Sequence, residues 1–278
     1  MNLLTPVLAQ QVITFSWKVV TDNSDVFISG LRLTIFISFT SFAIATILGV
    51  FVALARMSSN KVISTIAAGY INVLRAVPLL VFIVFLYYGV AIFFRISFLT
   101  AVQAGILAFS LQYSAWLGEI FRSGIQAVPK GQREAAMAMG MGPVRAFLTI
   151  ILPQAVRVAI PPTGNMMIGM IKDSSLVYII GVQDLFRNSQ LLANRTFRYF
   201  EIYLALVLIY LALTTAVYYG MKLLERRLEP RDVLATSVPF YAPLRRRQRD
   251  RYANLRDRIA AEGNGRIGSS AASAAESG

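Results

Sequence analysis

Six ionic or hydrogen-bonding residues stand inside long apolar stretches of the sequence. They are Arg75, Asn165 and the consecutive residues Lys172, Asp173, Ser174 and Ser175. Charged groups within apolar spans are costly and mark functional sites by default. Arg75 or Lys172 can meet a carboxylate and Asp173 an ammonium group, while the serines and Asn165 supply hydrogen bonds. The set therefore suits a small molecule that carries both charges.

The same kinds of residue also fit structural roles. Lys172 and Asp173 can neutralise each other and fix a break in a helix. Glu119 and Arg122 are spaced i, i+3 and predict a local ion pair. Gln112 favours a hydrogen bond between helices. Both interpretations of Lys172 and Asp173 are open at this point.

The composition is that of a membrane protein. The chain has 278 residues, of which 56% are hydrophobic and 15% charged, whereas soluble domains are about 45–50% apolar and about 25% charged. It has no cysteine and no histidine, which excludes disulfides, thiol chemistry and histidine metal sites. On a membrane chain the net charge of +13 reports topology first, so no nucleic-acid partner is predicted.

The apolar pattern predicts an all-α membrane protein with five transmembrane helices, since a bilayer core takes about 20 apolar residues as helix. The predicted spans are 33–55, 75–94 (after a leading helix at 62–74), 96–118, 156–180 and 202–221. We expect the fourth span to break at Pro161-Pro162 and again at 172–175. The stretch 184–201 is predicted to be a polar connection.

Basic residues set the predicted orientation. The loop after the third span and the C-terminal tail are rich in arginine and lysine and lie on one side under a five-span count. Cytoplasmic loops carry such an excess, so the C-terminus is placed in the cytoplasm and the N-terminus outside. The predicted parts are an extracytoplasmic or interfacial segment at 1–28, a transmembrane domain at 29–228, and a basic, partly disordered tail at 229–278 that attracts anionic lipid.

The loop after the third span has its own helical pattern. Alanine forms helix readily but buries little surface, so 130–139 is predicted to be a smooth, short helix. Gly140 can end it in the left-handed conformation. Pro143 starts a second helix, whose apolar residues recur at helical spacing on one face. They are Val144, Phe147, Leu148, Ile151 and Leu152.

The loop resembles the signature loop of the permease subunits of bacterial ABC importers. The matching pattern is Glu134-Ala135-Ala136, three residues, Gly140, nine residues, Ile150, one residue, Leu152-Pro153. The stretches 73–89, 113–136 and 152–185 resemble the polar amino-acid branch of that family, the histidine, glutamine and glutamate type. Family members often have Gly-Thr in place of Ala76-Val77 and Thr in place of Ser174, which weakens inference about the substrate.

The resemblance implies a type I importer permease fold in which the alanine-rich helix is a coupling helix. Its implied contacts to a separate ATPase are Lys130, Gly131, Arg133, Glu134, Ala135, Ala136 and Gly140. The predicted substrate pathway consists of Pro78 and the six polar residues of the apolar stretches, Arg75, Asn165, Lys172, Asp173, Ser174 and Ser175. The implied partners are a pair of ATPase subunits, a second permease copy or homologous permease, an extracytoplasmic solute-binding protein and membrane lipid.

The predicted function is therefore ATP-driven import of polar amino acids across the bacterial plasma (inner) membrane, with glutamate, aspartate and glutamine as first candidates. No G-x-x-x-x-G-K-[ST] phosphate-binding pattern occurs in the chain. We accordingly expect no enzyme activity and no cofactor in this chain, with ATP and Mg bound by the ATPase. The alternative is an autonomous channel or secondary amino-acid transporter. Many such carriers are built from internal repeats, and the absence of a repeat in this sequence argues against this alternative.

Overall fold

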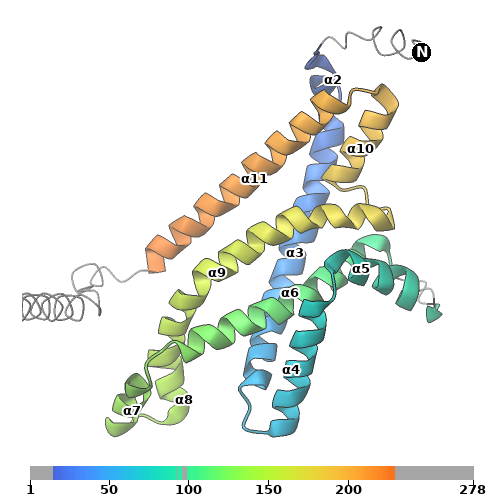
Figure 1. The fold of residues 1–278 in the computed structure, drawn as a ribbon. Helices are drawn as coiled ribbons and strands as arrows, with labels where there is room; N and C mark the ends of the chain where they lie inside the picture. Colours follow the sequence, from blue (N-terminus) through green and yellow to red (C-terminus); the bar gives the residue numbers. More distant parts are fainter. Residues whose placement is uncertain (1–14, 92, 96–98, 229–278) are drawn as a thin grey trace, which may run out of the picture. The chain divides into compact units, whose positions relative to one another are not determined.

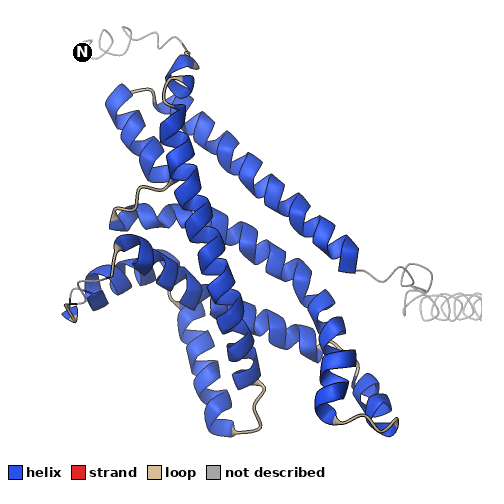
Figure 2. Cartoon of the chain, turned by 180° about the vertical axis from the view of Figure 1, so that it is seen from behind, coloured by secondary structure: helices blue, strands red, loops and turns tan. Residues whose placement is uncertain are grey.

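A computed structural model describes residues 15–91, 93–95 and 99–228. The first 14 residues and the tail 229–278, with its basic run and predicted disorder, lie outside the described residues. The described part consists of helices joined by short loops (Figures 1 and 2). In chain order the helices are α2 (Lys18–Thr21), α3 (Ser24–Arg56), α4 (Lys61–Ala76), α5 (Leu79–Val84), the π-helix η1 (Phe85–Ala91), α6 (Ala101–Gln126), α7 (Lys130–Ala138), α8 (Pro143–Ala146), the π-helix η2 (Phe147–Ile151), α9 (Leu152–Asp173), the 3₁₀ helix η3 (Ser174–Ile180), α10 (Leu185–Thr196) and α11 (Tyr199–Leu228).

Helices α3 and α6 form the centre of this fold and cross at close range (Figure 1). A Cβ atom on Gly49 would lie 2.9 Å from the Cβ of Leu117, and one on Gly118 would lie 2.7 Å from a methyl of Val52. Small residues allow backbones to approach where apolar packing holds membrane helices together. These two glycines therefore set the distance between the two central helices.

The chain bends sharply between α4 and α5. The axes of Lys61–Ala76 and Leu79–Val90 differ by 104°, so the predicted division into a leading helix and a second span is present, with the boundary at 77–78 instead of 74–75. Pro78 explains the bend, because a proline pushes the preceding residue out of the helical region, and Val77 is extended with ψ 128°. The Gln112 amide donates to the carbonyls of Leu74 and Val77, at 3.0 and 2.7 Å. The predicted interhelical hydrogen bond of Gln112 is confirmed, and it anchors the bend to α6.

Helix α9 continues through both of its prolines, so the break predicted at Pro161-Pro162 is wrong. Membrane helices tolerate proline where side chains and neighbouring helices satisfy the freed backbone groups. Here α9 packs against α6 and α11. The predicted break at 172–175 is a change of helix type, because Ser174 begins the 3₁₀ helix η3 with no gap in the chain's helical path.

The predicted polar connection 184–201 contains a helix, α10. Asp184 caps its start by accepting from the backbone N–H groups of Phe186 and Arg187, at 3.2 and 3.0 Å. The N–H of Leu185 donates to the Thr34 hydroxyl at 3.1 Å, which fastens α10 to α3. An aspartate followed by a helical pattern is the sequence signal for this cap.

Three helical stretches of the described chain can cross a membrane by length and composition. They are Ser24–Arg56, Pro143–Ile180 and Tyr199–Leu228, and the bent pair α4 and α5 makes a fourth. Helix α6 is the remaining predicted span. Its glutamines and its Glu119–Arg122 pair make it more polar, and it is buried at many positions by the surrounding helices.

We expect Asp184 to make the stability of the chain depend on pH. It lies between the spans Pro143–Ile180 and Tyr199–Leu228, and burial raises the pKa of its carboxyl from 3.8 to about 6, against the hydrogen bonds from Arg187 and Phe186. The folded chain therefore holds this proton more tightly than the unfolded chain. Consequently the free energy of unfolding should fall as the pH rises from about 4 to about 6.

The matched variants are Asp184→Asn and Asp184→Ala, measured by chemical unfolding in detergent between pH 4 and pH 7. Asp184→Asn keeps an acceptor and should abolish this decline. Asp184→Ala also loses the helix cap, so its free energy of unfolding should be lower than that of Asp184→Asn by about 1 kcal/mol at every pH. If the free energy of unfolding of Asp184→Asn still falls with rising pH as in wild type, a group other than Asp184 causes the decline.

Candidate functional site

The predicted short helix is present as α7, at the end of the described body opposite α2 and α10 (Figure 1). It ends at Ala138, one residue before the predicted boundary. Gly140 follows with φ +82°, the left-handed conformation predicted for it, and the N–H of Met141 donates to the carbonyl of Ala136 at 3.1 Å. A β-carbon disfavours this backbone conformation, so glycine is the residue that best stops the helix here.

Most of α7 is available for contact with another molecule. The exposed residues among those predicted to bind an ATPase are Lys130, Gly131, Arg133, Glu134, Ala135 and Gly140. Ala136 differs, because it is fully buried within the chain itself. It packs α7 against the body of the protein, so it supports the exposed face from behind.

Short connections hold α7 between two long helices. Three residues, 127–129, separate it from α6, and four residues, 139–142, separate it from α8. The apolar face predicted for the second helix is divided, since Ile151 is buried whereas Val144 and Leu148 are exposed. The π-helix η2 accounts for this, because its wider turns shift residues off the spacing of an ordinary α-helix.

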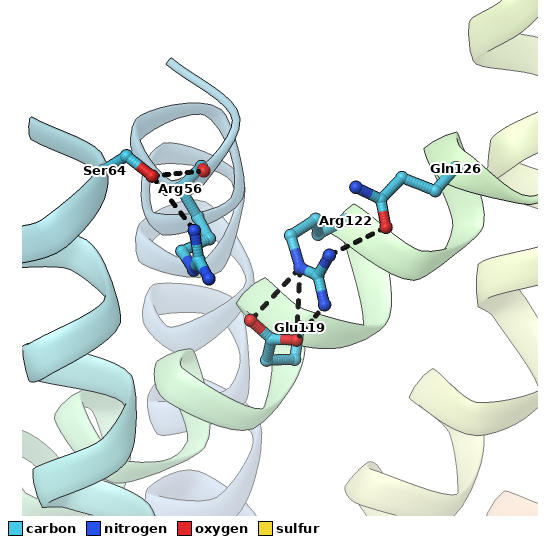
Figure 3. Close-up of polar contacts among 5 residues, drawn as sticks. All are labelled: Arg56, Ser64, Glu119, Arg122 and Gln126. Carbon is cyan, nitrogen blue, oxygen red and sulfur yellow. Dashed lines mark hydrogen bonds and ion pairs between the residues drawn. The ribbon is translucent and has the colours of Figure 1, made fainter. Parts of the chain in front are cut away.

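A polar cluster lies on α6 near α7. Arg122 binds Glu119 at 2.6 Å, which confirms the predicted ion pair, and it donates to the Gln126 side chain at 2.7 Å. Across from this pair, the Arg56 guanidinium donates to the Ser64 hydroxyl at 2.9 Å (Figure 3). This second contact ties the end of α3 to α4.

Arg75 lies at the C-terminal end of α4, over the ring of Trp116 on α6. The guanidinium carbon is 4.1 Å from the ring centroid, a distance typical of a cation–π interaction. Trp116 therefore holds this arginine against α6. Arg75 therefore lies in the last turn before the bend, with its side chain against α6.

Asp173 accepts a hydrogen bond of 2.7 Å from the Tyr113 hydroxyl. It makes no ion pair with Lys172 in the described part of the chain, so the contact observed for Asp173 is the one to Tyr113. Successive residues on a helix point in different directions, and Lys172 is exposed. Tyr113 was not among the predicted site residues. Its signal in the sequence was a hydroxyl between the polar residues Gln112 and Ser114, inside a predicted span.

The remaining predicted pathway residues are dispersed. Ser174 and Ser175 donate to the carbonyls of Ile171 and Lys172. Pro78 stands at the bend, and Asn165 lines a small cavity of about 80 Å³ between α9 and α11. The structure thus brings Asp173 to Tyr113 and Arg75 to Trp116, two residues that lie one turn apart on α6.

The chain belongs to a family of membrane transport components. Residues 45–230 match the family described as "Binding-protein-dependent transport system inner membrane component". A probable amino-acid permease protein of Bacillus subtilis, YxeN, is 36% identical over 214 residues, which cover 77% of this chain and 96% of that protein. The glutamine transport system permease protein GlnP of Escherichia coli K12 is 30% identical over 215 residues, covering 77% and 98%.

Solved structures show the same fold. A chain from the crystal structure of an amino acid ABC transporter with histidines has a TM-score of 0.72 and 38% identity, covering 77% of this chain and all of that one. A chain of the inward-facing MetNI methionine ABC transporter has a TM-score of 0.64 at 16% identity and supports the fold alone. The predicted ABC importer permease fold is confirmed, and the chain is a multi-pass inner-membrane transport component.

Proposed function

We propose that this chain is the permease subunit of an ATP-driven importer of polar amino acids, with glutamate, aspartate and glutamine as first candidates. Family membership and relatives named for amino-acid and glutamine transport support this class of substrate. The observation that carries the mechanism is the exposed, small-residue face of α7 at one end of the body. A separate ATPase pair, which binds ATP and Mg, docks there.

The short connections of α7 suit the transmission of force. Closure of the ATPase pair moves α7, and the connections at 127–129 and 139–142 pass this movement to α6 and α9 as a rigid-body displacement. A second permease copy or a homologous permease forms the other half of the path. A solute-binding protein delivers the substrate outside, where the N-terminus lies, and α7 and the C-terminus lie in the cytoplasm.

Asp173 is our candidate for binding the substrate ammonium group. The Tyr113 hydroxyl holds its carboxylate and leaves further acceptor positions on the two oxygens. Lys172 or Arg75 meets the substrate carboxylate, with Asn165 and the two serines further along the path. Asp173 stands at the end of α9, the helix that α7 moves.

We expect Asp173→Asn to lower the uptake of a zwitterionic amino acid by about tenfold or more, because a hydrogen bond to a charged group contributes about 1.5–3 kcal/mol. Tyr113→Phe should have a smaller effect, since the carboxylate remains but loses its fixed orientation. Thr214→Ala is the control, because it removes a hydroxyl that is bonded within its own helix and lies outside the proposed path. Uptake in Asp173→Asn equal to wild type would leave Asp173 with a structural role only.

The whole proposal is tested in proteoliposomes that contain the permease, its ATPase and its binding protein. Uptake of radiolabelled glutamine, glutamate and aspartate should require ATP on the side of the membrane where the ATPase is bound. Uptake by the permease alone, without ATPase, would instead support the autonomous channel or secondary transporter.

A further inference from the structure

An apolar cavity of about 390 Å³ lies between α3, α6 and α9. Its lining includes Val50 on α3, Phe121 on α6 and Val156 on α9. Its two polar lining side chains are Thr46 and Thr163, whose hydroxyls donate to the carbonyls of Phe42 and Ala159. The cavity therefore offers nothing to a polar ligand, and apolar cavities of this kind stay dry and take apolar ligands.

A second cavity of about 490 Å³ adjoins the first, since Ile125 and Phe147 line both. It lies between the ends of α3 and α6 and the start of α7, and Lys130 and Arg133 stand at its edge. Both side chains are exposed. Neither forms an ion pair with a carboxylate of the described chain, so both charges are available to an outside anion.

The two cavities match the two ends of one lipid. Helix α3, a candidate membrane span, ends at Arg56 and α6 ends at Gln126. The basic cavity therefore lies at the ends of these two helices, and the apolar cavity lies along them. We propose that they bind an anionic phospholipid. One acyl chain fills the apolar cavity, and the headgroup phosphate lies between Lys130 and Arg133. Basic residues at the membrane surface attract anionic lipids.

A lipid in this position connects the coupling helix to the spans. Its headgroup contacts the first turn of α7, while its chain contacts α3, α6 and α9. The bound lipid thereby stabilises one placement of α7 against the body. This site goes beyond the proposed transport function and does not depend on it, because it can be measured without any ATPase.

Native mass spectrometry of the purified full-length chain in detergent tests the proposal. Dioleoyl phosphatidylglycerol is compared with dioleoyl phosphatidylcholine, which has the same chains and no net charge. Inorganic phosphate is the competitor that lacks acyl chains. Phosphatidylglycerol should bind more tightly than phosphatidylcholine, and inorganic phosphate should not displace it.

Variants address each cavity separately. Lys130→Gln combined with Arg133→Gln should weaken phosphatidylglycerol binding about 25-fold, at about fivefold per basic residue. It should weaken phosphatidylcholine less, because the choline cation offsets the charge of its phosphate. Val50→Phe fills the apolar cavity from an exposed position and should weaken both lipids. The matched control is Lys61→Gln combined with Arg226→Gln, which removes two exposed charges that line neither cavity. The control should keep both affinities.

Three results would overturn the proposal. If the control double variant lowers the affinity for phosphatidylglycerol as much as the basic-cavity variant does, the lipid responds to the net charge of the protein and not to this cavity. If inorganic phosphate displaces the lipid, the basic cavity is a site for a free anion. If Val50→Phe leaves lipid binding unchanged but converts a dimer to a monomer, a second copy of the chain covers the apolar cavity.

Discussion

Replacing Glu134 by lysine is expected to lower ATP-driven uptake at least about tenfold and to prevent the ATPase from co-purifying with the permease. The Glu134 carboxylate is exposed on α7 and has no ion-pair partner in the described part of the chain, so it is free to meet a cation of the ATPase. Reversing a charge at an interface juxtaposes like charges, which costs several kcal/mol. Each 1.4 kcal/mol corresponds to a factor of ten in binding.

Two further variants separate docking from folding. Gln132→Lys adds a positive charge at another exposed position of α7 and should reduce uptake less. Glu134→Gln keeps the shape of the side chain and should fall between Glu134→Lys and wild type. Both uptake and ATPase co-purification are measured for each variant, with the thermal stability of the permease as the check on folding. Normal co-purification and uptake in Glu134→Lys would refute the role of α7.

Gly124→Ala is expected to destabilise the chain by about 1–3 kcal/mol, the usual cost of overpacking. A Cβ atom at this position of α6 would lie 2.8 Å from the carbonyl oxygen of Ala155 and 3.2 Å from the Cβ of Ala159. Both contacts belong to the backbone or the first side-chain atom of α9, so neither can rotate away. The whole of α9 has to shift to admit one methyl group.

Gly69→Ala is the matched control, on α4. A Cβ atom there meets nothing within 4 Å, so only the higher helix propensity of alanine acts, and stability should rise by about 1 kcal/mol. The free energy of unfolding in detergent distinguishes the two glycines by its sign. Destabilisation by Gly69→Ala equal to that by Gly124→Ala would contradict the packing of α6 on α9.

Local features of the structure followed from the sequence where neighbouring residues determine them. The short helix 130–138, the left-handed Gly140 and the Glu119–Arg122 pair depend on residues at most four positions apart. Propensity, capping and i, i+3 spacing therefore predict them. Gln112 was predicted in type but not in partner, since the carbonyls that it binds are freed only by a bend some 35 residues away.

Features that depend on tertiary contacts were not predictable in the same way. The prolines at 161 and 162 looked like a break, yet they stand inside α9, which packs against α6 and α11. Pro78, a single proline, ends the helix before it because it holds Val77 in the extended conformation. Tyr113 and Asp173 are 60 residues apart in sequence, so only the crossing of α6 and α9 reveals their contact.

The unbroken helical path from Pro143 to Ile180 fixes the directions in which the side chains at its two ends point relative to each other. Its 38 residues start just after α7 and include Asp173, so both ends of the proposed mechanism share one rod. Inserting a single residue at its middle would turn one end by about 100° relative to the other and lengthen the rod by about 1.5 Å. The number of residues between Pro143 and Asp173 is therefore constrained as strictly as their identities.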